Sequence, residues 1–227
     1  MTTCLAPERL FSLRLALGAF VIIAAASLFG AIAEDIVNHD EPLGMLDLNV
    51  GQWLHRHATP AWTSLMLFFS AVGAPVTVLT IASASAIFLF WRRQRRAALL
   101  LALTVPGGIF LNFTVKGVIH RHRPIFDNPI QTLASYSFPS GHAVGSTLLF
   151  GALAAIVIWH VRDWRVRTLV PVGAALLIVL ICFSRIYLGV HYLSDVIAGV
   201  LVGIVWLSAC LIAMEALRDR DAPERRL

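Results

Sequence analysis

Two cations in the stretch KGVIHRHRP, residues 116–124, are spaced so that they can act on one anion. Lys116 and Arg123 are seven positions apart, and seven residues return to the same face of an α-helix after two turns. Lys116 is also the only lysine in the chain. The pair therefore suggests an anion site, and the alternative is two long side chains that extend from a membrane surface towards water.

The stretch that begins PSGH at residue 139 joins a polar helix start to a long apolar run. Ser140 is predicted to be the N-cap of this helix. Gly141 lets a ligand approach the backbone closely, and His142 falls on the first turn. A helix N-terminus offers free N–H groups and a partial positive charge, which suit phosphate. The alternative is a capped helix with a histidine at the membrane interface.

The stretch SRIYLGVHYLSD, residues 184–195, adds Arg185, His191 and Asp195. His191 and Asp195 are four apart, so on a helix they share a face, and the carboxylate can bond one ring nitrogen while the other stays free. A histidine oriented by a carboxylate recurs in activated nucleophiles and bases. The alternative is an ordinary helix start in which Asp195 favours the helix dipole.

The rest of the chain must position these groups, and its composition predicts that it does so inside a membrane. Of the 227 residues 58% are hydrophobic and 14% are charged, and the mean hydropathy is +0.79. Because about 20 apolar residues span a bilayer as a helix, we expect an all-α integral membrane bundle of six transmembrane helices, forming one domain over residues 1–227. The expected spans are 15–33, 62–90, 97–115, 143–160, 168–188 and 196–214.

The cations are distributed as expected for this topology. Thirteen of the 18 Lys and Arg residues form four clusters that fall on one side of six spans: Arg9 and Arg14; Arg92, Arg93, Arg95 and Arg96; Arg162, Arg165 and Arg167; Arg218, Arg220, Arg225 and Arg226. The positive-inside rule makes that side the cytoplasm, with both termini there. The net charge of +5 thus reflects topology, and no nucleic-acid partner is expected. The remaining five are Arg56, Lys116, Arg121, Arg123 and Arg185.

Two further features concern access to the outer side. Residues 34–60 should form an outer amphipathic segment, with Leu46, Leu48, Val50, Trp53 and Leu54 on an interfacial helix; a lid is the alternative. Bends are expected at 73–75 and 106–108, where glycine and proline occur together. These bends would open a sideways path for a lipid tail. Cys4, Cys182 and Cys210 suggest no disulfide.

Alternating spans bring the outer ends of the third to sixth helices together, and with them the three stretches between residues 116 and 195. Ionisable groups at membrane depth are costly and usually functional. Taken in order, Lys116 with Arg123-Pro124, Pro139-Ser140-Gly141-His142, and Ser184-Arg185 with His191 and Asp195 resemble the three signature motifs of the type 2 phosphatidic acid phosphatase superfamily. All internal spacings match.

The resemblance implies a role for each motif residue. It makes His191 the nucleophile on phosphorus, Asp195 the group that orients it, and His142 the acid and then the base. The phosphoryl oxygens would be bound by Lys116, Arg123, Ser140, Gly141 and Arg185, with Arg121 available to share a diphosphate. Phosphoryl transfer depends mainly on positioning and charge stabilisation, so we expect no metal and no other cofactor. A zinc site at His120 and His122 lacks a third ligand at suitable spacing.

We therefore expect a lipid phosphatase in a bacterial-type inner membrane, with its site facing the periplasm or exterior. Its partners would be the membrane and a lipid phosphate such as undecaprenyl diphosphate, phosphatidylglycerophosphate or phosphatidate. A phosphotransferase that passes the group from a polyprenyl diphosphate to another lipid uses the same motifs and stays an alternative. The spans disfavour a haloperoxidase, and the complete histidine and aspartate set disfavours a non-enzymatic lipid transporter. The sequence does not indicate the oligomeric state.

Overall fold

The computed structural model describes residues 7–127 and 129–220, which form eight helices and no strand. Their bounds are α1 (Pro7–Asn38), α2 (Glu41–Arg56), α3 (Pro60–Val72), α4 (Pro75–Trp91), α5 (Arg95–Ile119), α6 (Gly141–His160), α7 (Trp164–Tyr187) and α8 (Leu193–Arg220). Of these, α1, α5, α6, α7 and α8 are each long and apolar enough to cross a membrane, and the bent pair of α3 and α4 is a candidate for a sixth span. The predicted all-α membrane bundle is confirmed.

The expected span 62–90 is broken in the middle. Helix α3 ends at Val72 and α4 restarts at Pro75, with an angle of 45° between them. Pro75 has no N–H to continue the helix, and Thr77 Oγ1 donates to the Ala71 carbonyl, 2.8 Å away, across the break. A side chain at Gly73 would collide with Ile181 of α7. The predicted bend at 73–75 is thus confirmed as a break that packs closely on α7.

The second expected bend does not open a path. Helix α5 continues through Pro106 to Ile119. A Cβ at Gly107 would lie 2.6 Å from Trp206 Cζ2, and one at Gly108 would collide with Leu148. These glycines therefore let α5 pack tightly on α6 and α8, and the expectation of a gap for a lipid tail at 106–108 was wrong.

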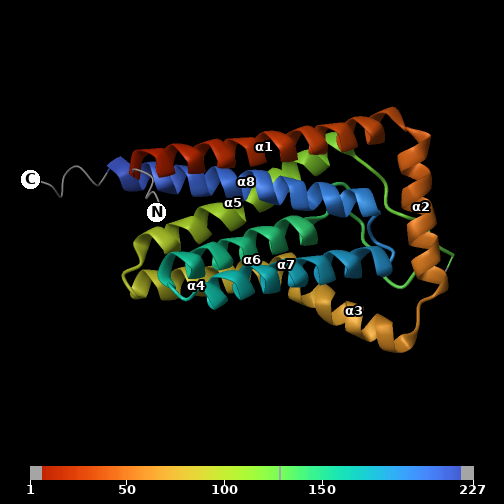
Figure 1. The fold of residues 1–227 in the computed structure, drawn as a ribbon. Helices are drawn as coiled ribbons and strands as arrows, with labels where there is room; N and C mark the ends of the chain where they lie inside the picture. Colours follow the sequence, from red (N-terminus) through yellow and green to blue (C-terminus); the bar gives the residue numbers. More distant parts are fainter. Residues whose placement is uncertain (1–6, 128, 221–227) are drawn as a thin grey trace, which may run out of the picture.

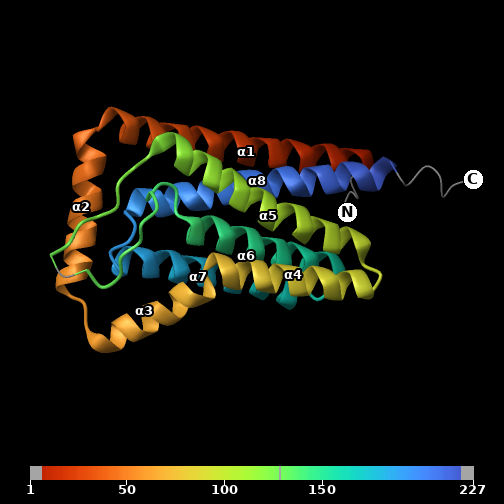
Figure 2. The same ribbon diagram turned by 180° about the vertical axis from the view of Figure 1, so that it is seen from behind.

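Figure 1 and Figure 2 show the long helices side by side, with α2 lying across one end of the bundle. A large apolar core joins α4, α5, α6 and α8, and its buried residues include Val78, Leu101, Val144, Leu148 and Val202. A second cluster, nearer α2, joins α2, α3, α6, α7 and α8 through residues such as Leu54, Met66, Ile186, Leu188 and Val190. The functional motifs lie at this α2 end.

The arginine-rich turns lie at the opposite end. The α4–α5 turn at 92–94 and the α6–α7 turn at 161–163 are at that end, together with the start of α1 and the end of α8 (Figure 1). The clusters around 92–96 and 162–167 are therefore on one side, as six spans require. Arg225, Arg226 and Cys4 lie outside the described residues. Cys182 and Cys210 are free cysteines.

The outer segment forms a helix, as predicted, but with different bounds and a different buried face. Helix α1 extends to Asn38, so α2 occupies only 41–56 of the expected 34–60. Leu48 and Trp53 are half-exposed or more, whereas the buried residues of α2 are Leu54 and a carboxylate, Asp47, which is 1% exposed. The connection to α3 is held by Tyr187 of α7, whose hydroxyl accepts from the Thr59 N–H at 3.0 Å.

Candidate active site

His191 lies in the turn between α7 and α8. Helix α7 ends at Tyr187, Gly189 adopts a left-handed conformation with φ of 71°, and α8 begins at Leu193. Glycine takes this conformation without steric cost. His191 therefore precedes the helix, and the expectation that it shares a helical face with Asp195 was wrong. The two still meet, because His191 Nδ1 lies 3.3 Å from Asp195 Oδ2.

Asp195 occupies the third position of α8 and is fully buried. Its Oδ2 accepts the Tyr192 N–H at 2.9 Å, which is how a carboxylate at this position caps a helix start. Its backbone carbonyl accepts the Ser140 N–H, also at 2.9 Å. One residue thus fixes the start of α8, the ring of His191 and the start of α6.

The surroundings of His191 favour a neutral ring with one unprotonated nitrogen. His191 is 4% exposed. Burial lowers the pKa of His191 to about 4, although the hydrogen bond to Asp195 and the charge of Asp195 oppose this shift. A carboxylate at Nδ1 favours the tautomer with the proton on that nitrogen. The lone pair is then on Nε2, which lies 3.2 Å from Arg123 Nη1.

Lys116 and Arg123 do converge, but not through helical spacing. Helix α5 ends at Ile119, and His120 turns the chain with φ of 51°. Lys116 in the last turn of α5 donates to the Tyr136 carbonyl at 2.6 Å, and Arg123 Nη2 in the following loop donates to the same oxygen at 3.1 Å. The two cations are therefore joined by a loop carbonyl, and the predicted shared helix face was wrong.

The rest of the Arg123 guanidinium is held by Ser135 and Val190. Nε donates to the Ser135 carbonyl at 2.6 Å, Nη2 donates to the Ser135 hydroxyl at 3.0 Å, and Nη1 donates to the carbonyl of Val190, the residue before His191. Burial lowers the pKa of Arg123, with the charge of Asp195 opposing. Arg123 is thus a preset cation beside Nε2 of the buried His191 ring.

Ser140 is the N-cap of α6 by position, as predicted, but its side chain makes no capping bond. Its Oγ is buried and has no hydrogen-bond partner among the described residues. Gly141 follows closely packed, since a Cβ there would lie 3.3 Å from Asn112 Nδ2 of α5. The free N–H groups and the free hydroxyl at this helix start are suited to an anion.

His142 and Arg185 meet at Ser70, a residue that the sequence analysis did not select. The His142 ring lies close to the Ser70 backbone, and Arg185 Nη1 donates to the Ser70 hydroxyl. Arg185 Nη1 also reaches Gln131 Oε1 at 3.2 Å. Ser70 is a buried polar residue one turn before the α3–α4 break. A polar residue in an apolar span just before Gly73 was the available signal.

Arg185 leaves two donors free. The residue is 1% exposed, and its Nε and Nη2 have no hydrogen-bond partner in the part of the chain that the structure describes. A buried guanidinium with unmade bonds costs free energy of at least a few kcal/mol. Together with Ser140 Oγ, these atoms form a set of buried donors for which a phosphoryl group would supply the acceptors.

Arg121 has a different role from the one expected. Its Nη1 lies 2.7 Å from Asp195 Oδ1, and its Nη2 lies 2.8 Å from Asp47 Oδ2. Burial opposes the charged form, but the Asp195 and Asp47 carboxylates outweigh it and raise the pKa of Arg121. Arg121 is thus bound by carboxylates, and the expectation that it shares a diphosphate was wrong.

The histidines beside Arg121 pack on an aromatic ring. The rings of His120 and His122 stand edge-on to Tyr136, with centroids 4.6 and 6.4 Å away. Within the described residues, no three His, Cys, Asp or Glu side chains are grouped so that they could hold a metal ion.

Known proteins are similar to this chain in sequence. The sequence model of the PAP2 superfamily matches residues 96–219, more than half of the chain. Phosphatidylglycerophosphatase B of Bacillus subtilis is 28% identical over 82% of this chain and 86% of its own. An undecaprenyl-diphosphatase of Sulfolobus acidocaldarius is 31% identical over 67% of this chain and 70% of its own.

A crystal structure supports the same relationship. The transmembrane PAP2-type phosphatidylglycerolphosphate phosphatase of Bacillus subtilis superposes with a TM-score of 0.76 at 26% identity, over 85% of this chain and 94% of that one. The sequence match, the shared fold and the buried histidine, aspartate and arginine set agree. The chain therefore belongs to the PAP2 superfamily, and it is a multi-span membrane phosphatase that hydrolyses phosphoric esters.

Proposed function

We propose that this phosphatase cleaves lipid phosphate or diphosphate esters through a phosphohistidine at His191. The supporting observation is the set of buried donors with no partner among the described residues, Arg185 Nε and Nη2 with Ser140 Oγ. The charge of Arg123 acts on both Lys116 and Arg185, so these three cations lie near one another. A phosphoryl group placed among them satisfies the donors and brings phosphorus towards His191 Nε2.

The first step forms a bond from His191 Nε2 to phosphorus and breaks the ester bond from phosphorus to oxygen. The leaving oxygen takes a proton from His142. The positive charge on the phosphorylated ring is balanced by Asp195, which lies 3.3 Å from Nδ1. Preset cations that need no reorganisation stabilise the charge on the equatorial oxygens.

The second step releases phosphate. His142 takes a proton from water, the water oxygen bonds to phosphorus, and the bond from phosphorus to Nε2 breaks. The His142 ring lies beside the Ser70 backbone during both transfers. General acid–base catalysis of this kind contributes about 10²–10⁴-fold.

For the substrate we place undecaprenyl diphosphate first and phosphatidylglycerophosphate second. Three cations, Lys116, Arg123 and Arg185, are available for the extra charge of a diphosphate. Beside His191 there is also a cavity of about 430 Å³ between α2 and the loop at 124–127, and Arg56 lines it. Relatives of both names match this chain. A long-chain substrate also explains a site at the end of a membrane bundle.

We further propose that the site faces the outside of a bacterial-type plasma membrane, in a single membrane domain. The support is the position of the arginine-rich turns at the end opposite α2 (Figure 1), because basic loops are retained in the cytoplasm. Lipid carriers that have delivered their cargo outside present their phosphates at this surface.

Rapid-quench labelling with a phosphorus-labelled lipid tests the chemical roles. His191→Ala should form no phosphoenzyme. His142→Ala should slow turnover by about 10²–10⁴-fold and least for substrates with good leaving groups. His160→Ala is the matched control, because His160 is at the far end of α6 and hydrogen-bonds the Ile156 carbonyl of its own helix. A phosphoenzyme that persists in His191→Ala would reassign the nucleophile. Analysis of the products shows whether the phosphoryl group passes to water, as in a phosphatase, or to a second lipid, as in a phosphotransferase.

A further inference from the structure

Asp47 is an unusual residue for the helix that carries it. Helix α2 lies across the outer end of the bundle with most of its side chains exposed, yet Asp47 is 1% exposed. A carboxylate is buried only where partners compensate for lost hydration. The partners of Asp47 all belong to the region around the nucleophile, although none of them is among the motif residues that bind phosphate.

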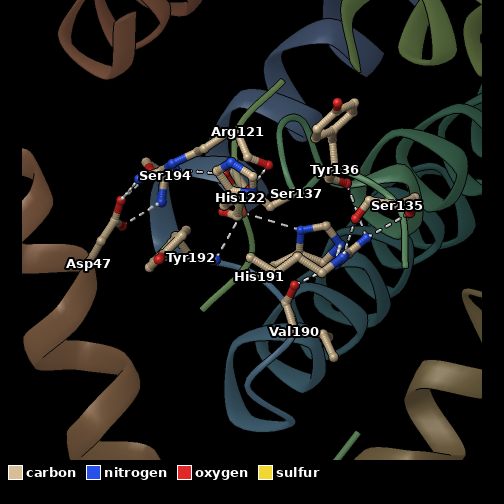
Figure 3. Close-up of polar contacts among 12 residues, drawn as sticks. Asp47, Arg121, His122, Ser135, Tyr136, Ser137, Val190, His191, Tyr192 and Ser194 are labelled. Atoms are coloured by element: carbon tan, nitrogen blue, oxygen red, sulfur yellow. Dashed lines mark hydrogen bonds and ion pairs between the residues drawn. The ribbon is translucent and has the colours of Figure 1, made fainter. Parts of the chain in front are cut away.

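The first contact of Asp47 is with the start of α8. Its Oδ1 accepts the Ser194 N–H at 2.9 Å, and its Oδ2 accepts the Ser194 hydroxyl at 2.5 Å. Asp47, a residue of α2, therefore caps the start of α8 at Ser194, the residue before Asp195. Figure 3 shows the Asp47 side chain pointing from α2 towards Ser194 and Arg121.

The second contact continues to the nucleophile. Asp47 Oδ2 lies 2.8 Å from Arg121 Nη2, and Arg121 Nη1 donates to Asp195 Oδ1 and to Ser194 Oγ, both at 2.7 Å. The opposite oxygen of Asp195 faces His191 Nδ1. The groups thus follow one another in the order Asp47 carboxylate, Arg121 guanidinium, Asp195 carboxylate and His191 imidazole. Both carboxylates contact the Arg121 guanidinium, and Asp195 also contacts the imidazole.

The guanidinium is also fixed from its face. Arg121 stacks over the Tyr192 ring, with 4.2 Å from its Cζ to the ring centroid. The contact with the ring and the bonds to two carboxylates hold the Arg121 guanidinium between Tyr192, Asp47 and Asp195. Without Asp47, the only carboxylate left to Arg121 in this network is Asp195. That single bond no longer fixes the angle of the Asp195 carboxylate, and the His191 ring is oriented by that carboxylate.

We propose that Asp47 is a positioning residue for His191, acting through Arg121, Ser194 and Asp195, so that activity requires α2 to be seated on the bundle. This inference rests on the proposed role of His191 as nucleophile. With this role, α2 differs from a passive interfacial anchor, because an anchor would carry apolar residues at its centre and not a buried carboxylate.

Asp47→Asn keeps the size of the side chain and an acceptor for Ser194 but removes the charge that faces Arg121. Phosphate is held by other residues, so the loss should appear in the chemical step and not in ground-state binding. We expect kcat to fall about tenfold to hundredfold, as a misplacement of up to about 1 Å does. The KM and the inhibition constant of inorganic phosphate should stay within about threefold.

A double-variant comparison identifies the route. If Asp47 acts through Arg121, then Asp47→Asn combined with Arg121→Gln should cost no more in kcat than Arg121→Gln alone. The matched control is Asp40→Asn at the start of the same helix, where the exposed side chain makes no capping bond. It should retain wild-type kcat.

The proposal is overturned if folded Asp47→Asn keeps kcat within threefold of wild type, if phosphate affinity falls in step with kcat, or if the two losses multiply. Should Asp47→Asn fail to fold, Ser194→Ala decides, since it removes the hydroxyl between Asp47 and Arg121 and should show the same selective loss of kcat, of smaller size. All of these arms measure phosphate release. A wild type without a phosphohistidine would therefore refute the nucleophile while the dependence on Asp47 is still measured.

Discussion

Replacing Gly199 with alanine tests whether the start of α6 must be held closely against α8. A Cβ at Gly199 would lie 2.7 Å from the carbonyl oxygen of Ser140 and 2.8 Å from the Cβ of Ala143. Ordinary contacts of a Cβ begin at 3.4 Å, so the two helices must separate by 3.4 − 2.7, or 0.7 Å, at this point. A backbone oxygen cannot rotate out of the way as a flexible side chain can.

The displaced atoms belong to the proposed phosphate site. Ser140 carries the free hydroxyl and begins the helix on which His142 lies, and its N–H bonds the carbonyl of Asp195 at 2.9 Å. A shift of 0.7 Å thus moves the proposed acid, His142, relative to the proposed nucleophile, His191. Because a misplacement of about 1 Å can cost about 10²-fold, we expect kcat/KM to fall about tenfold to hundredfold. Overpacking should also destabilise the fold by about 1–3 kcal/mol.

Phosphate release from lipid in mixed micelles measures the effect, with the folded fraction set equal by thermal unfolding. Gly173→Ala is the matched control, because a Cβ at Gly173 in α7 meets nothing within 4 Å. Alanine there should keep full activity and favour the helix by up to about 1 kcal/mol. If Gly199→Ala retains kcat/KM within threefold of wild type, the close contact of α6 and α8 does not set the geometry of the site.

The other predictions concern metal, pH and orientation. Phosphate release should continue in EDTA and be inhibited by vanadate; loss on chelation that zinc or magnesium reverses would contradict the metal-free mechanism. Since the folded-state pKa of His191 is lowered from 6.5 to about 4, the unfolded chain binds more protons between these values, and stability falls as pH drops through this window. By pH 4 the wild type should lose about 3 kcal/mol relative to His191→Gln in thermal unfolding; equal pH dependence of the two proteins would refute the neutral buried ring. With native cysteines removed, a cysteine at Asp127 should react with an impermeant thiol reagent in intact cells and cysteines at Arg93 and Arg165 should not; the reverse pattern would place the site in the cytoplasm.

Local chemistry was enough to predict the bundle. Long apolar runs form membrane helices because their backbone must bond internally, so the candidate spans begin and end within five residues of the predicted bounds. The break at 73–75 followed from Gly73 and Pro75. The same residue types at 106–108 predicted an opening that packing against Trp206 and Leu148 fills.

The motif residues were also readable, because their types and short spacings are properties of the chain itself. Their geometry was not. Lys116 and Arg123 meet through the carbonyl of Tyr136, which belongs to a loop whose path depends on the folded bundle. His191 stands before α8, because Gly189 turns the chain there.

The partners of the site were decided by tertiary structure alone. Asp47 and Ser194 are 147 positions apart, and Ser70 and Arg185 are 115 apart. No local pattern links such pairs, since the contact exists only after α2 has crossed the end of the bundle and α3 has packed on α7. The sequence by itself determined which groups can do the chemistry. The packing of helices that are distant in the chain determined which buried charges these groups contact. It therefore determined which of them we propose to bind phosphate and which to orient other residues.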